Sequence, residues 1–381
     1  MRSHWHGHGN DLTLGRKLRD VNWGLLLLIT LIASIGFATL YSAGGGKIDP
    51  WADRQMARFA IGVVIMLIIS VTDIRLWMRL SYLFYGIAVV LLVAVDVVGR
   101  IGMGAQRWLD LGIFSVQPSE IMKISIVLAL ARYFHGLNYD EVGQIRWLIV
   151  PLFMVLIPVG LVMKQPDLGT AMLLMATAGG VFFFAGVRLW KFAVAIAGGA
   201  AMMPIAWNFL HDYQRKRVLI FLDPEQDPLG AGYHILQSKI ALGSGGFTGK
   251  GFLQGTQSHL SFLPEKQTDF IFTMLAEEHG LVGALVLLLL YILLISYSYA
   301  IALRSRNQFG RLLAGGITTM MFFYVFINIA MVSGLVPVVG VPLPLVSYGG
   351  TAMMTLLVGM GLLIGVYVHR DVEIPRHMSG L

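Results

Sequence analysis

Residues 23–42 read WGLLLLITLIASIGFATLYS, a stretch without a single charged side chain. A helix rises about 1.5 Å per residue, so about 20 apolar residues cross the hydrocarbon core of a bilayer. Arg16, Lys17 and Arg19 stand just before this stretch, and no small-residue cleavage site followed by a soluble domain comes after it. The stretch is therefore predicted to be a retained transmembrane helix and not a signal peptide.

The same apolar pattern recurs along the chain and predicts an all-α integral membrane protein of about ten transmembrane helices. The expected spans are 23–42, 56–72, 81–97, 118–134, 147–163, 168–186, 190–207, 279–300, 313–333 and 349–368. Residues 208–278, between spans seven and eight, are too polar for the bilayer and too long for a passive connector. They are expected to form one long extracytoplasmic loop.

Composition agrees with a protein built for lipid. Hydrophobic residues make up 56% of the 381 residues and charged residues only 13%, with a mean hydropathy of +0.73. An ordinary soluble domain carries about a quarter charged residues. The net charge of +7 therefore suggests basic residues that flank membrane spans and touch anionic headgroups, and not a nucleic-acid partner. Cysteine is absent, which excludes a disulfide framework and a thiol nucleophile.

Basic residues of short loops orient a membrane protein, because they remain on the cytoplasmic side. With the N-terminus inside, the inner segments carry Arg2, Arg16, Lys17, Arg19, Arg75, Arg79, Arg132, Arg146, Arg188, Lys191, Arg304, Arg306, Arg311, Arg370 and Arg376. The short outer loops carry fewer: Lys47, Arg54, Arg58, Arg100, Arg107 and Lys164. Both termini are thus predicted to be cytoplasmic. The expected division is a tail (1–22), helices 1–7 (23–207), the outer loop (208–278), helices 8–10 (279–368) and a tail (369–381).

The fourth span opens with two charged residues that lipid would penalise. Glu120 and Lys123 stand three residues apart, on one face of a helix that Pro118 starts. A charge at the bilayer centre costs at least about 2.5–3.5 kcal/mol, so such groups are expected to be paired or functional. A local ion pair and a role in holding a ligand are both compatible with the sequence.

Two outer loops add polar groups near that turn. Arg107 precedes it by one short loop, although a cation beside Trp108 is also ordinary at a membrane interface. Asp167 follows Gln165-Pro166 at the start of span six, where capping of the helix is its expected task.

Asp269 is followed at once by Phe270-Ile271-Phe272, so its carboxylate stands at the edge of an apolar stretch. Partial desolvation strengthens a carboxylate as a base. The alternative, that Asp269 only begins a helix and faces water, is the more common situation for such a residue in an arbitrary membrane protein.

The last outer loop, residues 340–351, contains two prolines that prevent a complete helix. Ser347 there offers a hydroxyl close to span ten, and irregular backbone at such depth must be covered by protein or line a wet cavity. All these polar groups fall at outer helix ends. Together they predict an outward-facing polar cavity in a helical bundle.

The glycine-rich residues 243–251 lack the preceding strand and following helix of a phosphate-binding Walker loop, which excludes nucleotide binding there. A loop whose backbone a substrate can approach is compatible with them. The sequence contains no strong metal-ligand cluster.

Four motifs in order, taken together, resemble the SEDS family of shape, elongation, division and sporulation proteins. They are GAQRWLDLG with QPSEIMKI (104–112 and 117–124), QPDLGTA (165–171), QSHLSFLPEKQTDFIF with AEEHG (257–272 and 276–280) and VPLPLVSYGG (341–350). The stretches 254–265 and 339–351 are more similar to the elongation branch, RodA, than to the division branch. One departure is Gln267, where the family commonly has histidine, which argues against an indispensable acid or base at that position.

The resemblance implies a peptidoglycan glycosyltransferase in the bacterial cytoplasmic membrane. Such an enzyme polymerises lipid II on the outer face with inversion and release of undecaprenyl pyrophosphate, beside a class B penicillin-binding protein that cross-links the strands. The motif match carries the family's essential aspartate onto Asp269 and its charged pair onto Glu120 and Lys123, with Arg107, Asp167 and Ser347 as further cavity residues.

A leaving pyrophosphate needs its negative charge met. Basic residues that could meet it are Arg107, Lys123, Arg215, Lys216 and Arg217, directly or alongside a divalent cation, Mg²⁺ or Mn²⁺. A lipid II flippase and a noncatalytic scaffold for the transpeptidase are the alternatives. The absence of a clear internal repeat and the outward clustering of polar groups favour an enzyme over a transporter.

Overall fold

A computed structural model describes residues 13–102, 105–110, 112, 115–209, 212–223, 227, 231–256 and 265–375. Its membrane-length and connecting helices are α1 (Leu14–Arg19), α2 (Trp23–Ala43), α3 (Ala52–Val71), α4 (Ile74–Val98), α5 (Pro118–His135), α6 (Tyr139–Val142), the 3₁₀ helix η1 (Ile145–Leu148), α7 (Ile149–Lys164) and α8 (Leu168–Ala185). They continue with α9 (Leu189–Phe209), α10 (Asp212–Leu222), α11 (Ala231–Ser244), α13 (Ile271–Arg304), α14 (Gln308–Val332) and α15 (Gly350–Val368).

Every expected span coincides with a helix. Among the described residues, eight helical stretches are long and apolar enough to cross a membrane. The other two expected spans are α5, which carries Glu120, Lys123 and Arg132, and α9, whose apolar part is Leu189–Pro204. The prediction of an all-helical, multi-pass membrane protein is thus confirmed.

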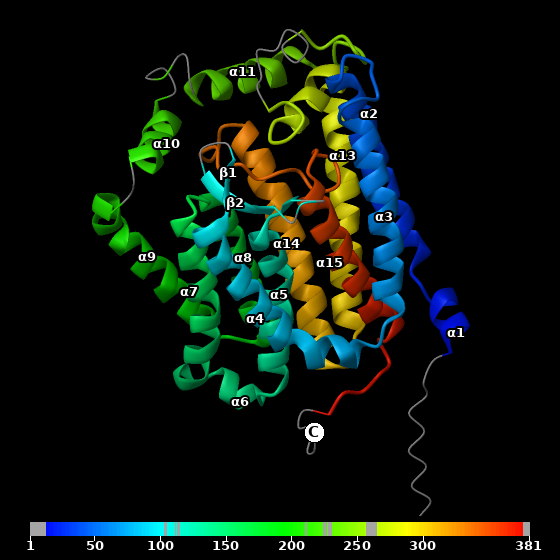
Figure 1. The fold of residues 1–381 in the computed structure, drawn as a ribbon, viewed down its shortest axis with the longest axis vertical. Helices are drawn as coiled ribbons and strands as arrows, with labels where there is room; N and C mark the ends of the chain where they lie inside the picture. Colours follow the sequence, from blue (N-terminus) through cyan, green and yellow to red (C-terminus); the bar gives the residue numbers. More distant parts are fainter. Residues whose placement is uncertain are drawn as a thin grey trace, which may run out of the picture.

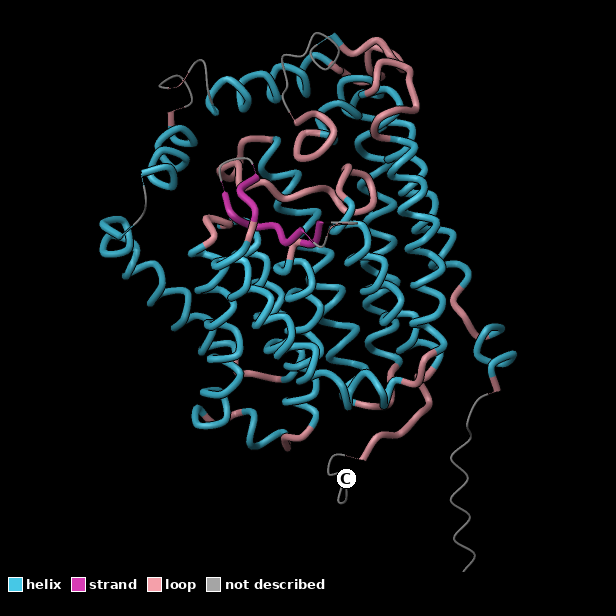
Figure 2. The backbone as a smooth tube through the Cα atoms, viewed as in Figure 1, coloured by secondary structure: helices cyan, strands magenta, loops and turns pink. Residues whose placement is uncertain are grey.

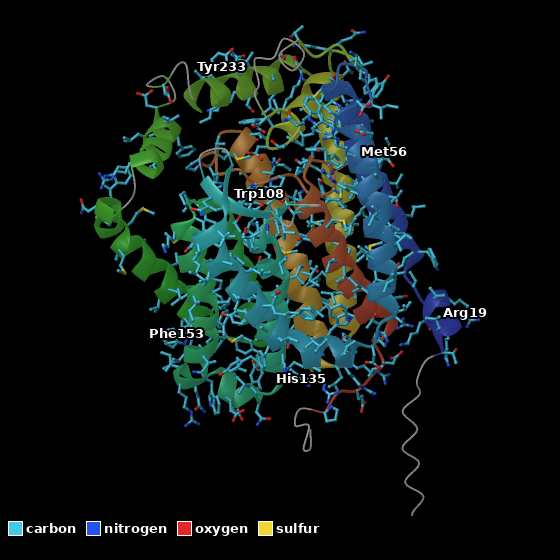
Figure 3. All side chains as sticks on the ribbon, viewed as in Figure 1. Arg19, Met56, Trp108, His135, Phe153 and Tyr233 are labelled. Carbon is cyan, nitrogen blue, oxygen red and sulfur yellow. The ribbon has the colours of Figure 1, made fainter. Side chains whose placement is uncertain are left out.

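Different elements lie at the two ends of the helical bundle. The sheet region, α10 and α11 lie at the upper end, whereas α1 and the last described residues lie toward the lower end (Figure 1). The labelled side chains agree, with Trp108 and Tyr233 at the upper part and His135 at the bottom (Figure 3). We refer to the upper end as the outer end, following the orientation predicted from the basic residues.

The core is formed by α5, α8, α14 and α15, whose inward residues are almost all buried. By contrast α9 is exposed along most of its length, and Figure 1 shows it leaning away from the bundle, with α10 above it at the side and α11 across the outer end. Apolar exposure of this kind is what a lipid-facing helix requires.

Three short segments, residues 100–102, 105–110 and 115–116, form a small sheet where the sequence predicted a plain loop. Strand β2 (Ala105–Asp110) pairs antiparallel with β1 (Arg100–Gly102) and with β3 (Ser115–Val116), at the outer end of the bundle (Figure 2). The sheet provides hydrogen-bond partners for backbone groups at the membrane edge and fixes the main chain at Arg107.

The segment expected as one loop, residues 208–278, contains α10, α11 and the first turns of α13. Helix α13 begins at Ile271, before the expected start of span eight, and it bends at Gly280, whose φ is +65°. The glycine-rich residues pack on this bend. Leu281 N donates to Gly246 O (3.0 Å), and Gly251 N donates to Glu278 O (3.0 Å), so the loop satisfies backbone groups that the bend takes out of the helix.

Close packing explains Gly249 in this loop. Its φ is +84°, and a Cβ atom there would stand 2.1 Å from Glu278 O. We expect Gly249→Ala to destabilise the protein by at least about 1–3 kcal/mol, the usual cost of a strained backbone, and to lower the thermal unfolding midpoint in detergent. Gly243→Ala is the matched control, because Gly243 lies in α11 with open space around it. Equal midpoints for the two variants would contradict this account of the loop.

Candidate functional site

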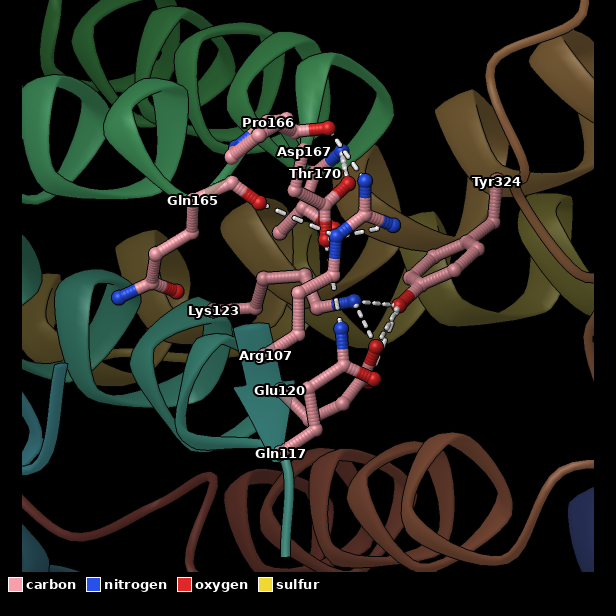
Figure 4. A network of polar contacts seen from close by, with 9 residues as sticks. All are labelled: Arg107, Gln117, Glu120, Lys123, Gln165, Pro166, Asp167, Thr170 and Tyr324. Carbon is pink, nitrogen blue, oxygen red and sulfur yellow. Dashed lines mark hydrogen bonds and ion pairs between the residues drawn. The ribbon is translucent and has the colours of Figure 1, made fainter. Parts of the chain in front are cut away.

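The charged pair of α5 is buried in the protein. Lys123 Nζ lies 2.6 Å from Glu120 Oε1, and the two side chains are 1% and 6% exposed. Tyr324 of α14 completes the group: its hydroxyl accepts a hydrogen bond from Lys123 Nζ and donates to Glu120 Oε2 (3.2 Å). Figure 4 shows the three polar ends converging. The ion pair that the sequence allowed is therefore present, and a tyrosine from a distant helix closes it.

Arg107 and Asp167 form a second group beside the first. Arg107 Nη1 lies 3.9 Å from Asp167 Oδ2, and the same guanidinium donates to the main-chain oxygens of Gln165 (3.2 Å) and Pro166. Gln117, which precedes α5, donates to Asp167 Oδ2 (3.3 Å) and so connects this group to the helix that bears Glu120. With 26% of its side chain exposed, Arg107 is the more accessible cation of the network, whereas Lys123 is covered.

Asp167 both caps a helix and carries charge. Its Oδ1 accepts from Thr170 N (3.1 Å) at the start of α8, as the sequence predicted. Asparagine caps helices as well as aspartate, whereas alanine does not. We expect Asp167→Asn to keep the thermal unfolding midpoint near that of the wild type and Asp167→Ala to lose about 1 kcal/mol of stability. Equal midpoints in a detergent unfolding assay would contradict the capping role.

Asp269 lies in a turn, residues 265–270, at the outer start of α13. A Cβ atom placed on Gly340 would lie 3.5 Å from Asp269 Oδ2, so the carboxylate stands beside the loop between α14 and α15. Lys266 belongs to the same turn, and burial lowers the pKa of its amine below the ordinary value. A carboxylate therefore stands at the edge of the bundle among partly desolvated groups.

Ser347 is occupied in holding this turn. Its Oγ donates to Thr268 O (2.6 Å) and accepts from Leu343 N (2.7 Å), and its residue is 4% exposed. Gln55 of α3 then donates to Ser347 O (2.8 Å). Ser347, which was predicted to line the cavity, is thus buried, and its hydroxyl is committed to main-chain groups of the protein.

Helix α14 joins the two parts of the site. Tyr324 contacts the charged pair, and Asn328, one helical turn further, donates to Asp269 O (3.0 Å) and Val341 O (2.7 Å). Residues four apart share one face of a helix and differ by about 6 Å along its axis. The register of α14 therefore sets where the Asp269 turn stands relative to Glu120 and Lys123.

Sequence reasoning missed Tyr324, Asn328 and Gln117. Asn328 is a polar amide inside the apolar span 313–333, which is a signal by itself because an amide in lipid needs partners. Tyr324 gave no such signal, since tyrosine is common in membrane helices. Gln117 belongs to the motif QPSEIMKI, but its residue type indicates no particular role there.

The basic residues of the outer segment are only partly placed. Arg215 donates to Trp207 O (3.0 Å) and Asn208 O (2.8 Å), so it holds the end of α9. The side chains of Lys216 and Arg217 lie outside the described part of the chain, as do residues 257–264 of the third motif. Among the residues that the structure describes, no group of three or more histidine and acidic side chains is placed to hold a metal ion.

The chain is similar to known proteins along almost its whole length. A family model described as a cell cycle protein, FTSW_RODA_SPOVE, matches residues 20–372. The peptidoglycan glycosyltransferase MrdB of Escherichia coli K12 is 50% identical over 348 residues, which are 90% of this chain and 93% of that protein.

Two solved structures share the fold. A chain from a study of the structural coordination of polymerization and crosslinking by a peptidoglycan synthase complex has a TM-score of 0.82 and 34% identity, and covers 93% of this chain and 99% of its own. The rod shape determining protein RodA of Thermus thermophilus has a TM-score of 0.69 and 29% identity, with 93% and 98% covered.

Proposed function

The chain belongs to the FtsW/RodA/SpoVE family of cell cycle proteins, the SEDS family, and on this premise we propose that it is a peptidoglycan glycosyltransferase for cell elongation and rod shape. Its 50% identity to MrdB over nine tenths of the chain supports the activity. One observation supports a particular site for this activity. Helix α14 holds the Asp269 turn through Asn328 and also contacts the buried charged pair through Tyr324.

The reaction suits a carboxylate at an outer helix end. The substrate is lipid II, an amphiphile with an apolar polyprenyl tail, a pyrophosphate at the membrane surface and sugars outside. Asp269 takes the proton from the 4-hydroxyl of the acceptor N-acetylglucosamine, and that oxygen attacks the anomeric carbon of the lipid-linked N-acetylmuramic acid. The bond to the pyrophosphate oxygen breaks, and undecaprenyl pyrophosphate leaves with inversion. General base catalysis of this kind contributes about 10²–10⁴-fold.

The leaving pyrophosphate gains negative charge that a cation must oppose. Arg107 is the accessible cation of the polar network, and Asp167 and the carbonyls of residues 165 and 166 hold its guanidinium. Lys123 is covered, so it contributes through the field of its buried ammonium and not by an exposed contact. Glu120 and Tyr324 keep that ammonium in place.

A divalent cation, Mg²⁺ or Mn²⁺, is part of the proposal only as a companion of the pyrophosphate. Phosphate oxygens together with one or two carboxylates are a usual environment for Mg²⁺. The acidic side chains of the network, Glu120 and Asp167, are each committed to a cation in the described structure. No protein ligand set is therefore assigned to the metal.

The partner proposed for the enzyme is a class B penicillin-binding protein, which cross-links the strands. The likeness to a chain from a peptidoglycan synthase complex supports such a partner. The proposed location is the bacterial cytoplasmic membrane, with both termini inside. The distribution of basic residues and the position of both described chain ends toward one end of the bundle support that orientation (Figure 1).

The test is polymerisation of labelled lipid II by the purified protein together with its transpeptidase partner. Glycan strands of several disaccharides, released with undecaprenyl pyrophosphate, are expected. Movement of lipid II across a vesicle bilayer without strands would identify a flippase instead. Neither strands nor movement, in assays validated with a known polymerase, would identify a noncatalytic scaffold.

A further inference from the structure

The turn that bears Asp269 is held through its main chain by distant parts of the sequence. Three consecutive carbonyl oxygens each accept a hydrogen bond from the C-terminal part of the chain. Tyr348 N donates to Gln267 O (2.8 Å), Ser347 Oγ to Thr268 O (2.6 Å) and Asn328 Nδ2 to Asp269 O (3.0 Å). These carbonyls precede α13, so the helix itself provides no donors for them. We call this arrangement the carbonyl clamp.

Asn328 is the one side chain of the clamp that comes from a membrane-spanning helix. It is fully buried, and its amide group donates to two main-chain oxygens, those of Asp269 and Val341. Two carbonyl acceptors fix which end of the side chain is the nitrogen, because an amide oxygen turned toward them would repel both. The donor end of Asn328 is thus joined to the residue that carries the catalytic carboxylate.

The acceptor end of the Asn328 side chain shows that stability alone does not account for an asparagine at this position. Its Oδ1 is buried and has no hydrogen-bond partner among the described residues. A buried polar atom without a partner costs free energy that leucine, of nearly the same size, would avoid. The hydrogen bonds that its nitrogen donates to Asp269 O and Val341 O account for an asparagine at this position.

We propose that Asn328 is a positioning residue of the glycosyltransferase, which sets the distance between the Asp269 carboxylate and the charged pair of Glu120 and Lys123. The inference rests on the proposed function. Tyr324 contacts the pair one turn away on the same face of α14, so this helix holds Asp269 and the charged pair in a single register. A small displacement of a base from the proton that it takes lowers the rate of the chemical step and leaves the affinity for the substrate unchanged.

The experiment compares Asn328→Leu with a matched variant, Asn307→Leu. Asn307 is also a buried asparagine of the α14 region and also donates to a main-chain oxygen, that of Val372 (3.1 Å), but it caps the opposite end of the helix about 30 Å away. Both proteins are purified with the partner, matched for folded fraction by size-exclusion chromatography and unfolding midpoint, and assayed over a range of lipid II concentrations.

The expected result is that Asn328→Leu lowers kcat about 10- to 100-fold with KM for lipid II changed less than about twofold. Asn307→Leu is expected to lower the unfolding midpoint by loss of its cap while kcat per folded molecule changes less than about twofold. A kcat for Asn328→Leu equal to that of the wild type overturns the inference. So does a parallel loss in both variants, or a loss that appears in KM, because each indicates general loosening of the bundle.

These outcomes separate the inference from the proposed function. Strands from the wild type with unchanged kcat in Asn328→Leu would remove Asn328 from the mechanism and leave the glycosyltransferase intact. Absence of strands from the wild type, in an assay validated with a known polymerase, would overturn the function and the inference with it.

Discussion

Asp269→Asn is expected to abolish glycan strand formation, with a loss of about 10²–10⁴-fold in the rate of polymerisation of lipid II. Asparagine has the same shape as aspartate but does not take the proton of the acceptor hydroxyl. The fold should remain, because Asn328 holds this residue through its main-chain oxygen, which the substitution leaves unchanged. The measurement is strand formation by the purified complex at matched folded yield, together with the unfolding midpoint.

A matched control is Asp110→Asn. Asp110 is an exposed acid of strand β2 at the same outer end, and its Oδ1 accepts from Gly112 N (2.9 Å), a bond that asparagine also makes. We expect this variant to polymerise at the wild-type rate. Wild-type rates for Asp269→Asn would exclude the carboxylate from the chemistry, whereas a loss in both variants would indicate a general dependence on outer negative charge.

Lys123→Met is expected to destabilise the protein by about 3–5 kcal/mol and to abolish activity. The substitution leaves the Glu120 carboxylate buried without its cation, and removing one partner of a buried pair has this cost. The unfolding midpoint in detergent measures the first effect. Lys191→Met is the control, because Lys191 donates to a single carbonyl, Gly143 O (3.0 Å), at the other end of the bundle.

The double variant, Glu120→Gln with Lys123→Met, separates stability from function. Two neutral side chains of similar size leave no buried charge, so the midpoint should return close to that of the wild type. We expect polymerisation to stay at least about 10²-fold lower, because Arg107 then faces the leaving pyrophosphate without the buried ammonium of Lys123 near it. Recovery of activity together with stability would show that the pair only holds the bundle together.

Much of this protein could be read from its sequence, because the bilayer restricts what a chain can do. Backbone groups in lipid must be satisfied within a helix, so long apolar runs predict spans whatever their neighbours. All ten expected spans coincide with helices for this reason. Charged residues such as Glu120, Lys123 and Asp269 were also visible, since a charge at a helix end within apolar sequence stands out.

The sequence did not determine how these residues are held. The pairing of Glu120 with Lys123 is local, three residues apart on one helix, and was one of the two interpretations that the sequence allowed. Tyr324 and Asn328 join residues 201 and 59 positions away in the chain, so no spacing rule indicates them. The glycine-rich loop likewise acquired its role only where α13 bends at Gly280.

Features that the sequence determines differ from features that only the tertiary structure determines in the sequence separation of the residues that interact. The apolar spans and their predicted orientation depend on how each segment partitions between water and lipid, which is a property of local composition. The identity of the candidate site residues came from the resemblance of four motifs to the SEDS family. The carbonyl clamp and the buried pair depend on hydrogen bonds between residues far apart in sequence, whose energies depend steeply on distance and angle. Only the packing of α14 and of the loop that follows it could decide that Ser347 donates to Thr268 O and that Asn328 donates to Asp269 O.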